Sequence, residues 1–130
     1  MKLINRLPPR DLIRIFSGAI TRKATCVIKF YSDTCPKCHN IRPMYKDIAK
    51  KYANKNIFFY TYNSIEYPPR FAEEMGLKGV PSFCLVETGP QPIIKVLGES
   101  AKKDRRTYYT RDEIETFIDR HVDFLPTEKE

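Results

Sequence analysis

Residues 25–38, TCVIKFYSDTCPKC, decide the fold class of this chain. The run from Thr25 to Tyr31 is short, β-branched and almost continuously apolar, which is typical of a central strand covered on both faces. Only Lys29 interrupts the run. A short turn then leads into a helical pattern that opens with CPKC at residues 35–38. A buried strand that turns directly into a helix indicates an α/β fold.

The helical pattern continues from Pro36 to Tyr52. Its apolar residues recur at spacings of three and four, as on the buried face of an amphipathic helix. They are Ile41, Met44, Tyr45, Ile48, Ala49 and Tyr52. Pro43 lies inside the pattern and removes one backbone donor, so we expect it to kink the helix.

Strand-like and helix-like patterns alternate along the rest of the chain. The further strands expected are 2–6, 57–62, 82–86 and 93–97, and the further helices are 11–16, 70–75 and 111–122. The last helix follows Thr110 and Glu113, which have the spacing of a capping box. Residues 87–92 suit a hairpin, so the strands that they join should pair antiparallel. The predicted order is βαβαβαββα, in a single domain over 1–124 with a frayed tail at 125–130.

The composition is that of a soluble globular domain. Hydrophobic residues make up 42% of the 130 positions and charged residues 30%, which is too apolar for a disordered chain. The net charge of +7 favours encounters with acidic surfaces. The densest basic run, KKDRR at 102–106, is interpreted as a solvated loop, and we do not expect nucleic acid to be the partner.

The sequence also predicts a compartment. No apolar run reaches the ~18 residues needed to span a bilayer, and polar residues and prolines interrupt the first ten positions. We therefore expect a cytoplasmic protein with no membrane association. In a reducing compartment four cysteines are weak support for structural disulfides, so a close CxxC pair is catalytic or metal-binding.

Cys35 and Cys38 are the candidate reactive residues. A thiol at a helix N-terminus faces unpaired N–H groups, so the pKa of Cys35 should fall below the ~8.5 of a free thiol. Cys35 is the predicted nucleophile, and Cys38 is close enough to attack a mixed disulfide. Pro36 fits an early helical position, and Lys37 adds a positive charge that favours the thiolate.

Two other functions fit a CxxC pair. CPKCH, with His39, matches a haem c attachment pattern, but haem leaves the buried strand before the motif unexplained. A structural zinc site needs four ligands, and the chain has no second CxxC. Cys26 and Cys84 fall in predicted buried strands, where small apolar packing is the ordinary role of a cysteine.

Three separated features resemble the thioredoxin family. They are residues 27–38, the helix-kinking Pro43, and the Gly79-Val80-Pro81-Ser82 turn. The resemblance covers about Lys2 to Val122 and implies the thioredoxin fold, a central mixed β-sheet flanked by helices. It also implies a cis Val80–Pro81 bond facing the cysteines, a Val80 backbone that pairs with substrate, and Gly98 in the substrate groove. A trans proline at an edge strand and an ordinary turn glycine are the alternatives.

The sequence departs from the family pattern around the cysteines. Thr34 stands where most thioredoxins have tryptophan, and Pro36-Lys37 replaces the usual Gly-Pro. Lys29 stands where the family has a buried acid that assists proton transfer at the second cysteine. A buried lysine has a lowered pKa and could act on Cys38 as a neutral base or as a cation, whereas a lysine that reaches the surface would have no such role.

The favoured function is reduction of protein disulfides through a redox-active Cys35–Cys38 disulfide. Substrate contacts are expected from Thr34, Pro36, Lys37, Val80, Pro81 and Gly98. By resemblance the protein is a monomer, needs no metal or bound cofactor, and receives electrons from thioredoxin reductase or glutathione. The alternatives are a glutaredoxin-like, glutathione-dependent reductase and a non-catalytic subunit of a larger complex.

Overall fold

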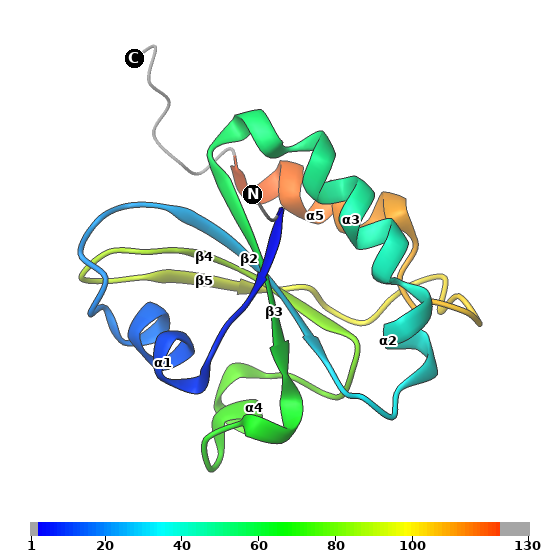
Figure 1. Cartoon of the computed structure of the whole chain (residues 1–130), viewed down its shortest axis with the longest axis horizontal. Coiled ribbons are helices and arrows are strands. Elements are labelled where there is room, and N and C mark those ends of the chain that lie inside the picture. The colour runs from blue at the N-terminus through cyan, green and yellow to red at the C-terminus, as the bar shows by residue number, and fades with distance from the viewer. Residues whose placement is uncertain (1–2, 123–130) are drawn as a thin grey trace.

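A computed structural model describes residues 3–122 of the chain (Figure 1). Its centre is a five-stranded sheet in the order β1-β3-β2-β4-β5. The strands are β1 (Ile4–Arg6), β2 (Thr25–Tyr31), β3 (Ile57–Asn63), β4 (Ser82–Glu87) and β5 (Ile93–Val96). β1 and β2 pair parallel with β3, whereas β4 pairs antiparallel with β2 and β5. The predicted mixed sheet and the β4–β5 hairpin are both confirmed.

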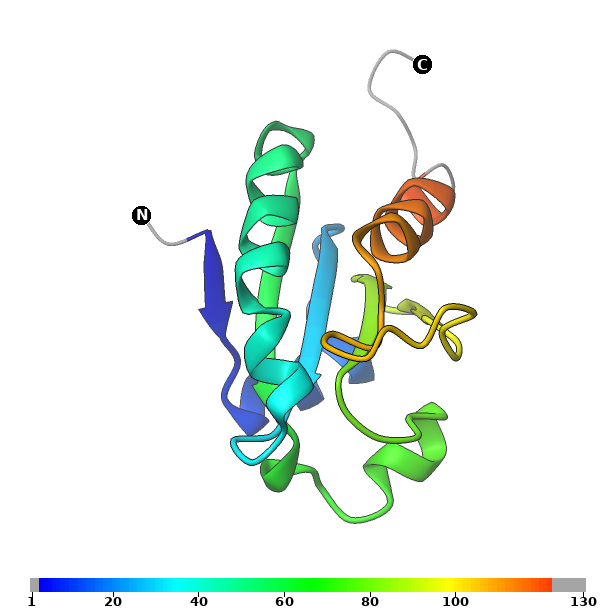
Figure 2. The same ribbon diagram turned by 90° about the vertical axis from the view of Figure 1, so that its right-hand side faces the viewer.

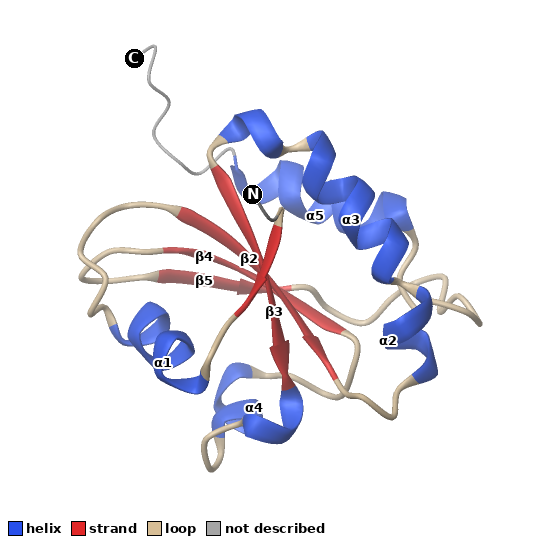
Figure 3. Cartoon of the chain, in the orientation of Figure 1, coloured by secondary structure: helices blue, strands red, loops and turns tan. Residues whose placement is uncertain are grey.

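Helices cover both faces of this sheet (Figures 2 and 3). The α-helices are α1 (Pro9–Ser17), α2 (Pro36–Asn40), α3 (Arg42–Lys51), α4 (Phe71–Met75) and α5 (Arg111–Val122). α3 and α5 pack on one face, in a core that includes Val27 and Phe83. α1 and α4 pack on the other face, in a core that includes Ile28 and Phe30. This is an α/β fold, as the sequence predicts.

The central strand β2 is buried along almost its whole length. Successive side chains of a strand point to opposite faces, so its odd and even positions enter different cores. Val27 lies in the core beneath α3, and Ile28 and Phe30 lie in the core beneath α1. Lys29 therefore points to the face that α2 and α3 cover, which is the face of the CxxC motif.

The helix predicted from Pro36 to Tyr52 is divided into α2 and α3. Pro43 explains the division, because it cannot donate the hydrogen bond that a continuous helix would direct to the carbonyl of His39. Regular bonding resumes when the Tyr45 N–H donates to the Ile41 carbonyl at 2.9 Å. The kink predicted from Pro43 is thus a break, which leaves α2 as a short separate support for the two cysteines.

The capping box is formed as predicted. The Glu113 N–H donates to the Thr110 hydroxyl at 3.2 Å, and the Thr110 N–H donates to Glu113 Oε1 at 2.9 Å. Two 3-10 turns, Ala53–Lys55 and Ser64–Glu66, were not predicted. The predicted domain end at 124 and the tail at 125–130 lie outside the described residues. Within 3–122 no helix is both long and apolar enough to cross a bilayer.

Candidate active site

The two motif cysteines lie at the start of α2 and form a disulfide. Cys35 is the N-cap residue of α2, and Cys38 is in its first turn, with their Cα atoms 5.2 Å apart. Cys38 is 2% exposed, whereas Cys35 is only partly buried. A substrate can therefore approach Cys35 first, and Cys38 lies behind it.

The backbone around the Cys35 sulfur provides a hydrogen-bond donor that suits a thiolate. Cys35 Sγ accepts a hydrogen bond from the backbone N–H of Cys38 at 3.1 Å, which replaces one of the donors that water would supply to an anion. The same Sγ lies 3.8 Å from the carbonyl oxygen of Val80. This contact joins residues 45 positions apart and fixes the 79–82 turn against the reactive sulfur.

The Val80–Pro81 peptide bond is cis, the isomer that the family resemblance implies. The Ser82 hydroxyl donates to the carbonyl of Gly79 and closes the turn. Val80, Pro81 and Gly98 line one cleft of about 660 Å³. The rest of its lining comes from residues 75–79, Ser82, Val96, Leu97, Glu99, Tyr108 and Tyr109. The resemblance placed Gly98 in the substrate groove, and the glycine lines this cleft.

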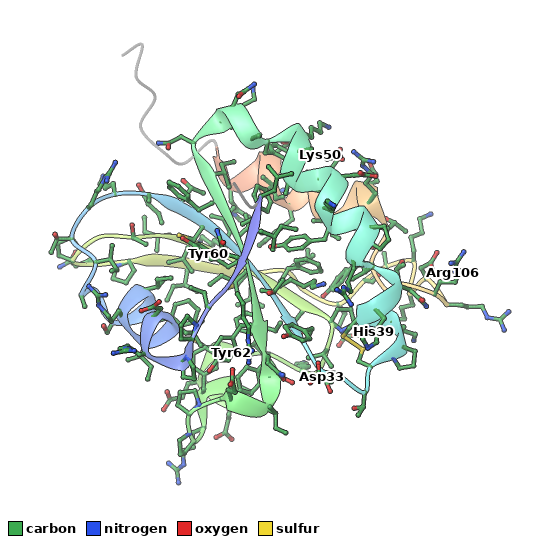
Figure 4. The ribbon with its side chains drawn as sticks, in the orientation of Figure 1. Asp33, His39, Lys50, Tyr60, Tyr62 and Arg106 are labelled. Atoms are coloured by element: carbon green, nitrogen blue, oxygen red, sulfur yellow. A yellow bond between two sulfur atoms is a disulfide. The ribbon has the colours of Figure 1, made fainter. Side chains whose placement is uncertain are left out.

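Thr34, Pro36 and Lys37 are exposed beside the disulfide. The Thr34 hydroxyl lies 3.1 Å from the Ser32 hydroxyl, so it folds back on its own turn. His39 also contacts this turn, because its Nε2–H donates a hydrogen bond to the Asp33 carbonyl at 2.9 Å (Figure 4). The rim in front of Cys35 is polar where a bulky aromatic residue would make it apolar.

Lys29 is the buried charge of the site. It is 3% exposed, which excludes a side chain that reaches the surface. It lines a second cavity, of about 870 Å³, together with Cys38, Arg42 and Tyr45. Burial, and secondarily the charge of Arg42, lowers the pKa of Lys29 to about 8.

Aromatic rings take the place of a carboxylate partner for Lys29. Its Nζ lies 5.3 Å from the ring centroid of Tyr45 and 5.9 Å from that of Tyr31. No ion pair of Lys29 is formed within residues 3–122. Ring faces stabilise a cation less than an anion does, so the lysine can lose its proton at moderately alkaline pH.

The model of the Thioredoxin family matches residues 14–110 of this sequence. The chain belongs to the thioredoxin family. It is similar to Thioredoxin H4 of Arabidopsis thaliana, 32% identical over 72 residues, a match that covers 55% of this chain and 58% of that protein. A thioredoxin-like protein of Fusarium culmorum is 26% identical over 83 residues, which cover 62% of this chain and 67% of the relative.

Solved structures share the thioredoxin fold at lower identity. The thioredoxin of Malassezia sympodialis has a TM-score of 0.63 at 20% identity, over 91% of this chain and 90% of that one. The Trx4 domain of ERdj5 has a TM-score of 0.69 at 17% identity, over 96% of this chain and 100% of the domain. These structures support the fold and leave the chemistry to the residues of this chain.

The other two cysteines of this thioredoxin-family chain lie in the core. Cys26 and Cys84 are free and buried, on β2 and β4. Burial raises the pKa of Cys26 to about 11 and also raises that of Cys84. No group of three or more potential metal ligands is found in the described part of the chain. Packing in the core is therefore the role that their surroundings support.

Residues 99–110 contact the site in a way that the sequence did not predict. The Asn40 side-chain amide donates to the Arg106 carbonyl at 3.0 Å, and the Lys37 ammonium lies 5.9 Å from the Tyr108 ring centroid. The Tyr109 hydroxyl donates to the Gly98 carbonyl at 2.7 Å. The four basic side chains of the KKDRR run are exposed, as predicted for a solvated loop, but Asp104 is partly buried and the loop itself packs beside α2. No pattern in the sequence marks Tyr108 or Arg106 as site residues.

Proposed function

We propose that this protein reduces disulfides of other proteins by dithiol–disulfide exchange. The observation that carries the proposal is the position of Cys35 Sγ. It accepts the Cys38 N–H at 3.1 Å and lies 3.8 Å from the carbonyl oxygen of Val80, a residue that lines the cleft. A partly exposed sulfur beside an open cleft is accessible to a substrate disulfide.

The first step starts from the reduced protein. The Cys35 thiolate attacks one sulfur of the substrate disulfide, so that one S–S bond breaks and a mixed disulfide forms. The first substrate sulfur leaves as a thiolate and takes a proton from solvent. Backbone groups of Val80 are the proposed partners of the bound substrate segment.

The second step releases the substrate. The Cys38 thiol loses its proton, and its sulfur attacks Cys35 Sγ, so that the Cys35–Cys38 disulfide forms, the mixed disulfide breaks and the second substrate sulfur leaves as a thiolate. Two electrons have then passed from the protein to the substrate. We assign the proton acceptor for Cys38 to Lys29, because both line the same cavity and the pKa of Lys29 is lowered to about 8.

The cycle needs an external reductant to restore the dithiol. The proposed donor is thioredoxin reductase, with glutathione as the alternative, and no bound metal or cofactor takes part. We further propose that the protein works in the cytoplasm as a monomer. A reducing compartment would keep the Cys35–Cys38 pair in its reduced, attacking form.

An insulin-disulfide reduction assay with two recharging systems tests the proposal. One arm supplies thioredoxin reductase, the other supplies glutathione and its reductase, and a dithiothreitol arm removes the need for either enzyme. The proposal predicts turnover with dithiothreitol and with one enzymatic arm. Absence of turnover above background in all arms would contradict it and favour a binding subunit.

A further inference from the structure

The loop over residues 99–110 is held together by hydrogen bonds beside the active site. The Glu113 carboxylate accepts the Ser100 hydroxyl at 2.7 Å and the Ala101 N–H at 2.9 Å. Asp104 accepts the Arg106 N–H at 2.8 Å, and its backbone pairs in both directions with Tyr108 at 2.8 Å. These bonds hold the backbone of the loop in one shape.

The same bonds decide which charges the loop presents. Asp104 and Glu113 direct carboxylate oxygens to backbone N–H groups of the loop, and these hydrogen bonds lower the pKa of both acids. The basic side chains have no such role in the loop. They are Lys102, Lys103, Arg105 and Arg106, and all are exposed. The loop therefore presents its positive charges to solvent.

The loop is also one wall of the cleft. Glu99, Tyr108 and Tyr109 line it together with Val80 and Pro81. Glu99 is the acidic residue of these three, and its carboxylate oxygen Oε1 pairs with the Lys103 ammonium at 4.0 Å. Lys78 also lines the cleft, and the Lys37 ammonium lies 5.9 Å from the Tyr108 ring centroid. A chain bound along Val80 would therefore pass close to the positive charges of Lys78 and Lys37.

We propose that the 99–110 loop docks an acidic segment that flanks the disulfide of the substrate protein. The inference rests on the proposed function for the identity of the cleft and adds the substrate class. Opposite charges at the rim of an interface mainly raise the association rate and select the partner. The loop would thus choose among disulfides that Cys35 attacks equally well.

A protein segment fits this surface better than a nucleic acid does. The basic side chains belong to the same loop as Tyr108, which lines the cleft together with Val80, and Cys35 Sγ lies 3.8 Å from the Val80 carbonyl oxygen. An extended peptide can contact the cleft and the loop together. A nucleic acid would use the loop alone, and this possibility is an outcome of the test.

The test compares matched peptides and matched variants. Each peptide carries the same disulfide and is flanked by glutamates or by lysines, and we measure kcat/KM for reduction at low and high salt. The anisotropy of a labelled glutamate peptide and of a labelled single-stranded oligonucleotide reports binding without turnover. The variant is Arg105→Glu/Arg106→Glu. The control is Lys50→Glu/Lys55→Glu, which changes the net charge equally at two exposed positions. Lys50 is on α3 (Figure 4), and Lys55 is in the following turn.

The proposal predicts that the glutamate peptide is reduced about tenfold faster than the lysine peptide at low salt, with the preference lost in the loop variant and kept in the control. Equal kcat/KM values for both peptides, in the wild type and in the loop variant, would overturn it while the reductase function stands. Preferential, loop-dependent binding of the glutamate peptide without any reduction would support the docking surface and reject the reductase function. Loop-dependent binding of the oligonucleotide in preference to the peptide would overturn the proposal.

Discussion

The four cysteines lie in two regions of the molecule, the start of a helix and the buried core, whose surroundings differ in how they affect a thiol. Cys35 and Cys38 lie at the end of a helix, where a backbone N–H points at sulfur and a cleft gives access. Cys26 and Cys84 lie in adjacent strands of the core, and burial raises the pKa of both. The comparison shows that reactivity comes from the position of the sulfur, since the residue type is the same.

The largest expected effect separates the two regions directly. Cys35→Ser should reduce insulin-disulfide turnover to the background rate of dithiothreitol, because no other exposed sulfur can start the exchange. Cys26→Ala is the matched control and should keep turnover. Loss of activity in Cys26→Ala with a normal melting temperature would show that the core region takes part in the chemistry.

The second prediction concerns Lys29, the charged neighbour of Cys38. Lys29→Met should slow resolution of the mixed disulfide by about 100-fold, the usual contribution of a proton-transfer group. The wild-type rate should rise with pH, with a midpoint near pH 8, because the pKa of Lys29 is lowered to about 8. This rise should disappear in the variant. Stopped-flow kinetics across pH 6 to 10 measures both effects. An unchanged rate and profile would leave Lys29 without a catalytic role.

A third prediction uses the same residue to test its burial. Below about pH 8 the folded and unfolded chains both carry the Lys29 charge, so folding bears the full cost of burying it. Between about pH 8 and 10.5 the unfolded chain binds a proton that the folded chain has lost, so the free energy of unfolding rises with pH by up to about 3 kcal/mol.

Lys29→Met removes this linkage. The stability of the variant relative to the wild type should be greatest below pH 8 and should decrease toward pH 10.5. Urea unfolding at pH 7 and pH 10 measures the difference. A constant difference between the two pH values would contradict the lowered pKa.

The capping box and the buried strands could be predicted from the sequence, because local patterns specify them. Thr110 and Glu113 are three residues apart, and the apolar run around Val27 marks a covered strand whatever surrounds it. Pro43 likewise marked the point where α2 and α3 separate, since the missing donor is a property of the residue itself.

The active-site surroundings depend on contacts between distant residues, which the sequence does not specify. A lysine in a short strand can reach the surface or stay inside, and only the cover of α3 and Tyr45 decides that Lys29 is buried. The 99–110 loop meets α2 through Asn40 and Arg106, which are 66 positions apart. Tyr108 adopts a φ of 64°, which is unusual for a bulky residue and has no signal in its neighbours.

The smallest expected effect lies in the core region. Cys84→Ser should lower the free energy of unfolding by about 1 to 3 kcal/mol, because it buries a hydroxyl among apolar side chains. Turnover of the folded variant should match the wild type. Cys84→Ala, which buries no hydroxyl, is the control, and equal stability of the two variants would mean that the site around Cys84 accommodates a polar group.

Trapping of the exchange intermediate tests the central claim most directly. Cys38→Ser should stop the reaction after the first step, so that intact mass spectrometry detects one substrate peptide per protein chain. Peptide mapping should locate that peptide on Cys35. A substrate attached to Cys26 or Cys84, or no adduct with a substrate that the wild-type protein reduces, would contradict the assignment of Cys35 as the nucleophile.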